Sequence, residues 1–171
     1  ADLVLLRFAQ TAELAAQEVY RNAERGVRAT CFSEIPPYLD LPSVHTPYWE
    51  PFFRACAETG TVINMHIGSS SRMPSTSADA PAAVGSTLTF GNAMSSMTDW
   101  LFSGWLAQLP TLKLAYSEGQ IGWIPYILER ADKVWEDNRA WGGVSDKVSE
   151  PPSTYYYRQI YGCFFDDEYG L

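Results

Sequence analysis

Three polar residues stand where they could do chemistry: Glu34, His66 and Glu118, each at or just past the end of an apolar stretch of strand length. If these stretches are neighbouring parallel strands, their carboxyl ends share one edge of a sheet and the side chains can converge. A histidine with carboxylates is a ligand set for Zn²⁺ and related divalent ions. Taken alone, the residues leave an alternative open, with His66 as a hydrogen-bonded structural residue and both glutamates as helix caps or solvated loop carboxylates.

The elements that must position these residues follow a strand-helix alternation. The expected strands are 3–8, 27–32, 61–67, 112–118 and 160–165. The expected helices include one capped by Thr11 and stopped at Gly26, and one running from Pro51 to Gly60. A third is indicated by the helical spacing of Met94, Met97, Leu101 and Trp105, and a fourth by the apolar face of 124–137. A long loop rich in Ser, Pro and Ala is expected over 70–87.

Strands that alternate with helices predict an α/β fold with a parallel sheet. A closed (β/α)₈ barrel takes roughly 250 residues, whereas this chain has 171. A five-stranded doubly wound sheet fits the length. The first strand-helix turn, "RFAQTAEL", contains no glycine, and no nucleotide-binding glycine pattern occurs elsewhere in the chain.

Composition excludes several classes of partner. The formal net charge is −8 and the twelve basic residues are scattered, so nucleic acid is not expected to bind. No apolar stretch reaches the length of a membrane span. The three cysteines, Cys31, Cys56 and Cys163, lie far apart without a CxxC pair, which favours reduced thiols and a cytoplasmic location.

The segments "NMHIGSSS", "LKLAYSEGQIGWIPYILERAD" and "GVRATCFSEIPPYLDLPSVHTPYWEPFFRACAETGT" resemble the amidohydrolase-related branch of the amidohydrolase superfamily. This group includes aminocarboxymuconate semialdehyde decarboxylase. The resemblance implies a metal-dependent (β/α)₈ barrel of which residues 1–171 form a single partial domain with about five of the eight strands. It also implies that His66 is the metal-binding histidine of the fifth strand. The decarboxylases carry a histidine at the end of the sixth strand, where this chain has Glu118.

The function implied is that of a metal-dependent hydrolase or decarboxylase acting on a small carboxylated or aromatic substrate, with a divalent ion, zinc by preference. Glu118 would act as acid/base or as an extra ligand, and Glu34 would support the site. The loop after strand 27–32 offers His45, Tyr48 and Trp49 as substrate-binding residues, although these aromatic side chains fit core packing equally well.

The alternative is that the chain as given is catalytically inactive, as a truncated fragment or a self-associating interaction module. Five strands taken from a barrel would leave two unpaired edges. Their inward side chains, with Val4, Leu6, Val62, Leu114 or their neighbours as candidates, would face water. We therefore expect either a homo-oligomer or completion by segments outside residues 1–171.

Overall fold

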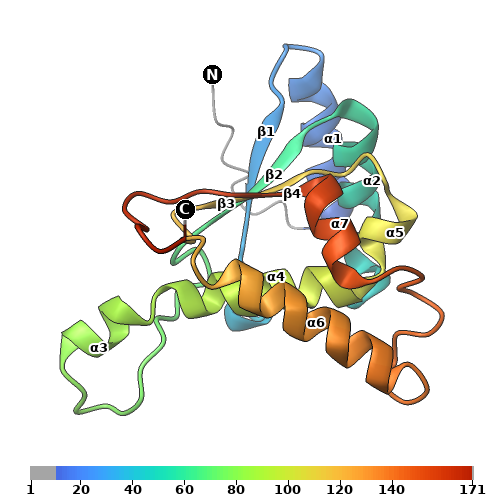
Figure 1. The fold of residues 1–171 in the computed structure, drawn as a ribbon. Coiled ribbons are helices and arrows are strands. Elements are labelled where there is room, and N and C mark those ends of the chain that lie inside the picture. Colours follow the sequence, from blue (N-terminus) through green and yellow to red (C-terminus); the bar gives the residue numbers. More distant parts are fainter. Residues whose placement is uncertain (1–10, 171) are drawn as a thin grey trace.

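The computed structural model describes residues 11–170 and contains parallel strands followed by helices (Figure 1). In chain order the elements are α1 (Ala12–Ala23), β1 (Ala29–Phe32), η1 (Pro36–Leu39), η2 (Pro47–Trp49), α2 (Glu50–Thr59), β2 (Val62–His66), α3 (Ala82–Thr87), α4 (Phe90–Ser103), α5 (Trp105–Gln108), β3 (Leu114–Ser117), α6 (Ile124–Asn138), α7 (Pro152–Gln159) and β4 (Ile160–Gly162). No helix in this part of the chain is long and apolar enough to cross a membrane.

The four described strands form one parallel sheet in the order β1-β2-β3-β4, which is also their order in the chain. A doubly wound sheet requires a reversal of strand order at its switch point, and the described strands have none. Sequential parallel order is instead that of a (β/α) barrel. The fold is therefore a partial barrel, and the doubly wound alternative is wrong.

The two faces of this sheet differ in burial. Ile63, Met65 and Leu114 are fully buried on the face covered by the helices. Val62 and Ala115, which point the other way, are only half-buried. The expectation that Val62 lies on the open face is confirmed. In β3 the open-face residue is Ala115, the neighbour of Leu114, because side chains alternate between the faces of a strand. Val4 and Leu6 lie outside the described residues.

Local sequence signals explain the helix ends. The Thr11 hydroxyl accepts a hydrogen bond from the Leu14 amide at 3.3 Å and caps α1. Gly60 ends α2 with a φ of 69° and donates its amide to the Cys56 carbonyl, a left-handed conformation that glycine adopts at little cost. These two boundaries are confirmed, whereas α1 ends at Ala23, before the predicted stop at Gly26.

Other boundaries differ from the expectation. The Ala-rich part of the predicted loop 70–87 folds into the short helix α3 after Pro81. The helix predicted from Met94 to Trp105 is interrupted at Gly104, whose φ of 87° separates α4 from α5. The last strand stops at Gly162 instead of residue 165. The predicted strand 3–8 lies outside the described residues.

The core between the sheet and α2, α4 and α5 is aromatic. Phe53 is fully buried, and its ring centroid lies 4.7 Å from that of Trp100 and 5.4 Å from that of Trp105. Aromatic pairs at such separations stabilise a core beyond the area they bury. This cluster joins three helices and fixes them on the sheet.

We expect Phe53→Ala to lower the free energy of unfolding by about 3–5 kcal/mol, because it leaves a cavity among rings that cannot close in. Denaturant titration followed by circular dichroism measures the change. Tyr126→Ala is the control, since Tyr126 is 68% exposed on α6 and its removal should change stability by less than about 0.5 kcal/mol. Equal effects of the two substitutions would contradict this assignment of the core.

Candidate active site

The carboxyl ends of β2 and β3 bring His66 and Glu118 together. Parallel pairing sets His66 beside Ser117, so the next residue of β3's loop lies within reach of the imidazole. His66 Nε2 and Glu118 Oε1 are 3.2 Å apart, and both side chains remain accessible to solvent. The expectation that the His66 and Glu118 side chains converge at this edge is confirmed.

The other ring nitrogen of His66 determines how this pair holds its proton. His66 Nδ1 lies 2.7 Å from the carbonyl oxygen of Ile67, and because a carbonyl oxygen only accepts, Nδ1 must carry hydrogen. In the neutral ring Nε2 then presents a lone pair to Glu118, which as a carboxylate also only accepts. The contact is attractive only if a proton or another cation lies between Nε2 and Oε1. The geometry therefore defines a pair that binds one positive charge.

The backbone of Glu118 is in a strained conformation. Glu118 has a φ of 63°, in the left-handed region that a residue with a side chain rarely adopts. Such a conformation costs on the order of 1 kcal/mol or more and persists only where surrounding contacts fix it. The Gln120 amide donates to the Cys163 carbonyl at 3.1 Å, and the Trp123 indole donates to the Gly119 carbonyl at 2.8 Å. The block "SEGQIGW" is thus a turn that presents Glu118 to His66.

Asp167 also fixes this turn, and the sequence analysis missed it. Its Oδ2 accepts hydrogen bonds from the amides of Ile121 at 2.8 Å and Gly122 at 2.6 Å. These two bonds hold the pKa of the Asp167 carboxyl below its usual range. No local pattern pointed to Asp167, because its partners lie more than forty positions earlier in the chain.

Glu34 reaches the same edge of the sheet from the end of β1. Its Oε2 accepts the Gly68 amide at 3.1 Å, and its own amide donates to Ser69 Oγ at 2.9 Å. The side chain is only 2% exposed, and its Oε1 has no hydrogen-bond partner among the described residues. Burial raises the pKa of Glu34 to about 7, an effect that the Gly68 amide and the charge of His66 oppose. Glu34 thus braces the loop that follows His66.

The three expected substrate-binding residues occupy different positions. Trp49 is buried in the core, where its indole donates to the Pro42 carbonyl at 2.7 Å and its ring packs edge-on against Phe32. Tyr48 packs edge-on against Trp49 and is partly exposed. Within residues 11–170, no hydrogen bond or ion pair joins either side chain to His66 or Glu118.

His45 lines a separate cleft. Its Nε2 lies 3.0 Å from Asp99 Oδ1 on α4. The cleft is bounded further by Phe102 of α4 and Trp135 of α6, among others. The structure therefore brings Glu34, His66 and Glu118 to one edge of the sheet, while His45 points to a different surface. A substrate-binding role for His45, Tyr48 and Trp49 stays a prediction.

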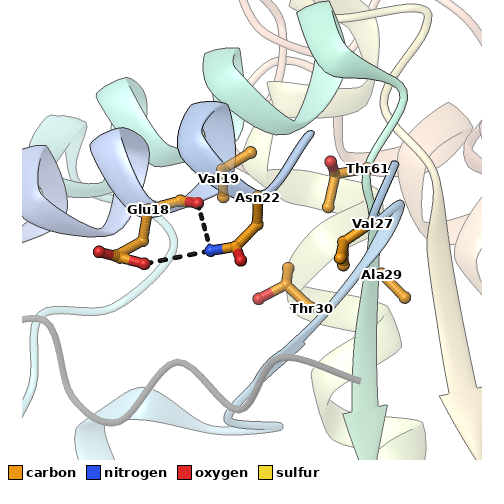
Figure 2. A pocket seen from close by; sticks show the side chains of 7 residues that line it. All are labelled: Glu18, Val19, Asn22, Val27, Ala29, Thr30 and Thr61. Carbon is orange, nitrogen blue, oxygen red and sulfur yellow. Dashed lines mark hydrogen bonds between the residues drawn. The ribbon is translucent and has the colours of Figure 1, made fainter. Parts of the chain in front are cut away.

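Another small hollow lies near the amino ends of the strands (Figure 2). It is lined by Glu18, Val19, Asn22, Val27, Ala29, Thr30 and Thr61. Asn22 Nδ2 donates to both the backbone and the side-chain oxygen of Glu18, at 2.8 Å and 3.1 Å, and so points back along α1 (Figure 2). In barrel folds this end of the sheet serves stability, whereas catalytic groups sit at the opposite end. We do not assign this hollow a catalytic role.

The described residues supply only part of a metal site. His66 has the arrangement common in metal-binding histidines, with one ring nitrogen donating to a carbonyl and the other free to coordinate. However, residues 11–170 contain no group of three or more His, Cys, Asp or Glu side chains that could hold an ion. His66 and Glu118 fit part of a divalent site and do not complete one.

Comparisons with known proteins agree with the fold. The family model described as Amidohydrolase matches residues 4–170. A search of curated proteins found no match. The chain belongs to the amidohydrolase family.

Two solved structures illustrate the likeness. One is 5-carboxyvanillate decarboxylase LigW from Sphingomonas paucimobilis, with 22% identity and a TM-score of 0.64 over 90% of this chain and 45% of that protein. The other is amidohydrolase map2389c from Mycobacterium avium subsp. paratuberculosis K-10, with 18% identity and a TM-score of 0.69 over 98% of this chain and 43% of that protein. At these identities the likeness shows the fold. The chain spans less than half the length of either protein.

We expect Glu34→Gln to stabilise the protein increasingly as pH rises. Below pH 4.5 the carboxyl is protonated whether the chain is folded or not. Between pH 4.5 and about 7 only the unfolded chain ionises, so the wild-type protein loses stability as pH rises through this window. Glutamine keeps an acceptor for the Gly68 amide and does not ionise. The variant should therefore gain up to roughly 3 kcal/mol over wild type by pH 8.

Denaturant titrations from pH 4 to pH 8 measure this difference. Glu129→Gln serves as the control, because Glu129 is exposed on α6 and its replacement should not change the shape of the pH profile. Parallel profiles for Glu34→Gln and wild type would show that the folded protein does not disfavour the Glu34 carboxylate.

Proposed function

We propose that this chain carries the acid-base part of the active site of a hydrolase or decarboxylase that acts on a small carboxylated or aromatic molecule. The observation that carries the proposal is the contact of His66 Nε2 with Glu118 Oε1 at 3.2 Å, made while Nδ1 is committed to the Ile67 carbonyl. A pair that holds one proton between two accessible atoms can give that proton to a substrate and take it back.

Two carboxylic acids support this proton transfer in different ways. Glu118 lies in contact with the imidazole of His66 and can accept a hydrogen bond from Nε2 when that nitrogen carries a proton. Glu34 has a pKa of about 7, so near neutral pH it is present in both protonation states, as efficient acid-base catalysis requires. Its buried carboxyl is positioned behind the loop 66–69. We propose that Glu118 exchanges a proton with the substrate. We propose Glu34 as a second general acid or base at the same site.

A divalent ion is part of this proposal, with zinc as the best match for an imidazole and a carboxylate. A catalytic zinc site takes three protein ligands, and His66 with Glu118 would supply at most two of them. The remaining ligands would come from outside residues 11–170. The proton transfer described above applies to the pair without an ion, because a metal on Nε2 would occupy the lone pair that takes up the proton.

Membership of the amidohydrolase family supports hydrolysis as the reaction. The likeness to a decarboxylase of known structure supports decarboxylation as the alternative. The name of that relative describes an aromatic carboxylate as the substrate of that protein. We propose the same chemical class for this one. A cytoplasmic location is proposed as well, supported by three cysteines that form no disulfide.

We expect Glu118→Gln to lower turnover at least about 100-fold, the usual contribution of a positioned acid or base. The glutamine side-chain amide can donate a hydrogen bond to His66 Nε2. The contact is then attractive without a proton on Nε2, so no proton is available for transfer. Turnover is measured as CO₂ release from 5-carboxyvanillate and as hydrolysis of aryl amides. Because the His66–Glu118 pair is exposed, the free energy of unfolding should change by less than about 1 kcal/mol.

Nitrogen NMR of the ¹⁵N-histidine-labelled chain provides an independent readout. The chain has only two histidines, and His45→Gln identifies the His66 signals while leaving the His66–Glu118 pair intact. In wild type and in Glu118→Gln, Nδ1 should keep its proton, and Nε2 should lose its proton in the variant. An unprotonated Nδ1 in the wild-type protein would contradict the proposed arrangement.

A second candidate function is self-association, favoured by the half-buried open face of the sheet. Tyr161 of β4 pairs in register with Ala115 and is 56% exposed. Strand edges and apolar faces left open in this way favour contact with another chain. In this reading the chain is a binding module with no activity of its own.

Sedimentation velocity tests this candidate. We expect a dimer or larger species, because covering Tyr161 and its neighbours removes apolar area from water. Tyr161→Glu should shift the population towards monomer. Tyr157→Glu, at a residue 78% exposed on α7, should leave it unchanged. A compact wild-type monomer at all concentrations would rule out self-association.

A further inference from the structure

A positively charged side chain, that of Arg72, lies at the same edge of the sheet as the candidate active site. Arg72 follows the end of β2, and its guanidinium lies over the ring of Tyr38, 4.9 Å from the ring centroid. Tyr38 belongs to η1, which follows β1. The pair therefore bridges the loops after two adjacent parallel strands, at the end where His66 and Glu118 meet.

Hydrogen bonds from a buried side chain fix the backbone at Arg72. The side chain of Asn92, buried on α4, donates to the Arg72 carbonyl at 2.6 Å and to Ser70 Oγ at 3.1 Å. Ser71 has a left-handed φ of 57°, a conformation that needs such support. The position of Arg72 is thus set by a buried side chain, although Arg72 itself is exposed.

The guanidinium is available to a ligand. None of the ion pairs among the described residues includes Arg72. Stacking on Tyr38 uses the flat face of the group and leaves the N–H donors at its edge, which match the two oxygens of a carboxylate. The same edge of the sheet carries the carboxyl groups of Glu34 and Glu118. A fixed positive charge beside these carboxyl groups favours the approach of an anionic substrate.

We propose that Arg72, stacked on Tyr38, is the substrate-binding residue that receives a carboxylate and thereby selects anionic over neutral substrates. The proposal rests on the proposed function, because it names the substrate class of the same site. Tyr38 and Asn92 are positioning residues that hold the guanidinium and its backbone.

The test uses benzoate and its neutral analogue benzamide as probes, with binding followed by NMR titration of the full chain. Wild type should bind benzoate at least about tenfold more tightly than benzamide. Arg72→Gln should abolish this preference, and Arg72→Lys should restore part of it, because lysine keeps the charge and loses the two-donor geometry. Tyr38→Leu should weaken benzoate binding and leave benzamide binding nearly unchanged.

Arg139→Gln is the matched control. Arg139 stacks on Trp135 at 4.5 Å, far along α6, so losing it removes a similar cation-aromatic contact elsewhere. It should leave the benzoate preference intact. Equal benzoate affinity in wild type and Arg72→Gln, or no preference for benzoate in wild type, would overturn the proposal. Thermal melting of each variant confirms that it is folded.

Failure of this inference can be told apart from failure of the proposed function. His66→Ala should retain the benzoate preference while losing turnover of 5-carboxyvanillate. If Arg72→Gln binds benzoate normally and His66→Ala is inactive, the carboxylate site is wrong and the acid-base site stands. If Arg72→Gln loses the preference and His66→Ala keeps full turnover, the carboxylate site stands and the acid-base assignment is wrong.

Discussion

The parallel pairing of β2 with both of its neighbours is the constraint on which the site depends. Register sets His66 opposite Ser117, so Glu118 is the first residue free to leave the sheet beside the imidazole. The same pairing sets Phe32 opposite Met65, which brings Glu34 past the end of β1 to the loop that follows His66. A shift of one residue in either pairing would turn these side chains to the opposite face.

Stability and chemistry are separated in this fold. Fully buried side chains fill the space between the sheet and its helices, including Phe53 of α2, Ile63 of β2 and Leu114 of β3. His66 and Glu118 lie at the accessible edge, where an ion pair contributes little to stability. Glu34 is the exception, because it is both buried and ionisable. Its pKa is raised because the carboxyl is buried against the loop that follows His66.

Each loop at this edge is held by a buried or bonded polar group. Two indoles fix the loop after β1, with Trp49 donating to the Pro42 carbonyl and Trp105 to that of Val44. Asn92 fixes the loop after β2, and Asp167 fixes the loop after β3. Trp49 was predicted as a substrate contact. In the structure its indole instead holds the loop after β1.

The sequence by itself determined the parallel α/β class, the capped ends of α1 and α2, and the three polar residues at the strand ends. Strand ends and helix caps depend on neighbouring residues, so local patterns carry that information. Only the tertiary structure decided the contact of His66 with Glu118, the burial of Glu34, the hydrogen bonds of Asp167 and the stacking of Arg72 on Tyr38. These depend on residues more than thirty positions apart, and their distances and desolvation exist only once the strands have paired and the loops have packed.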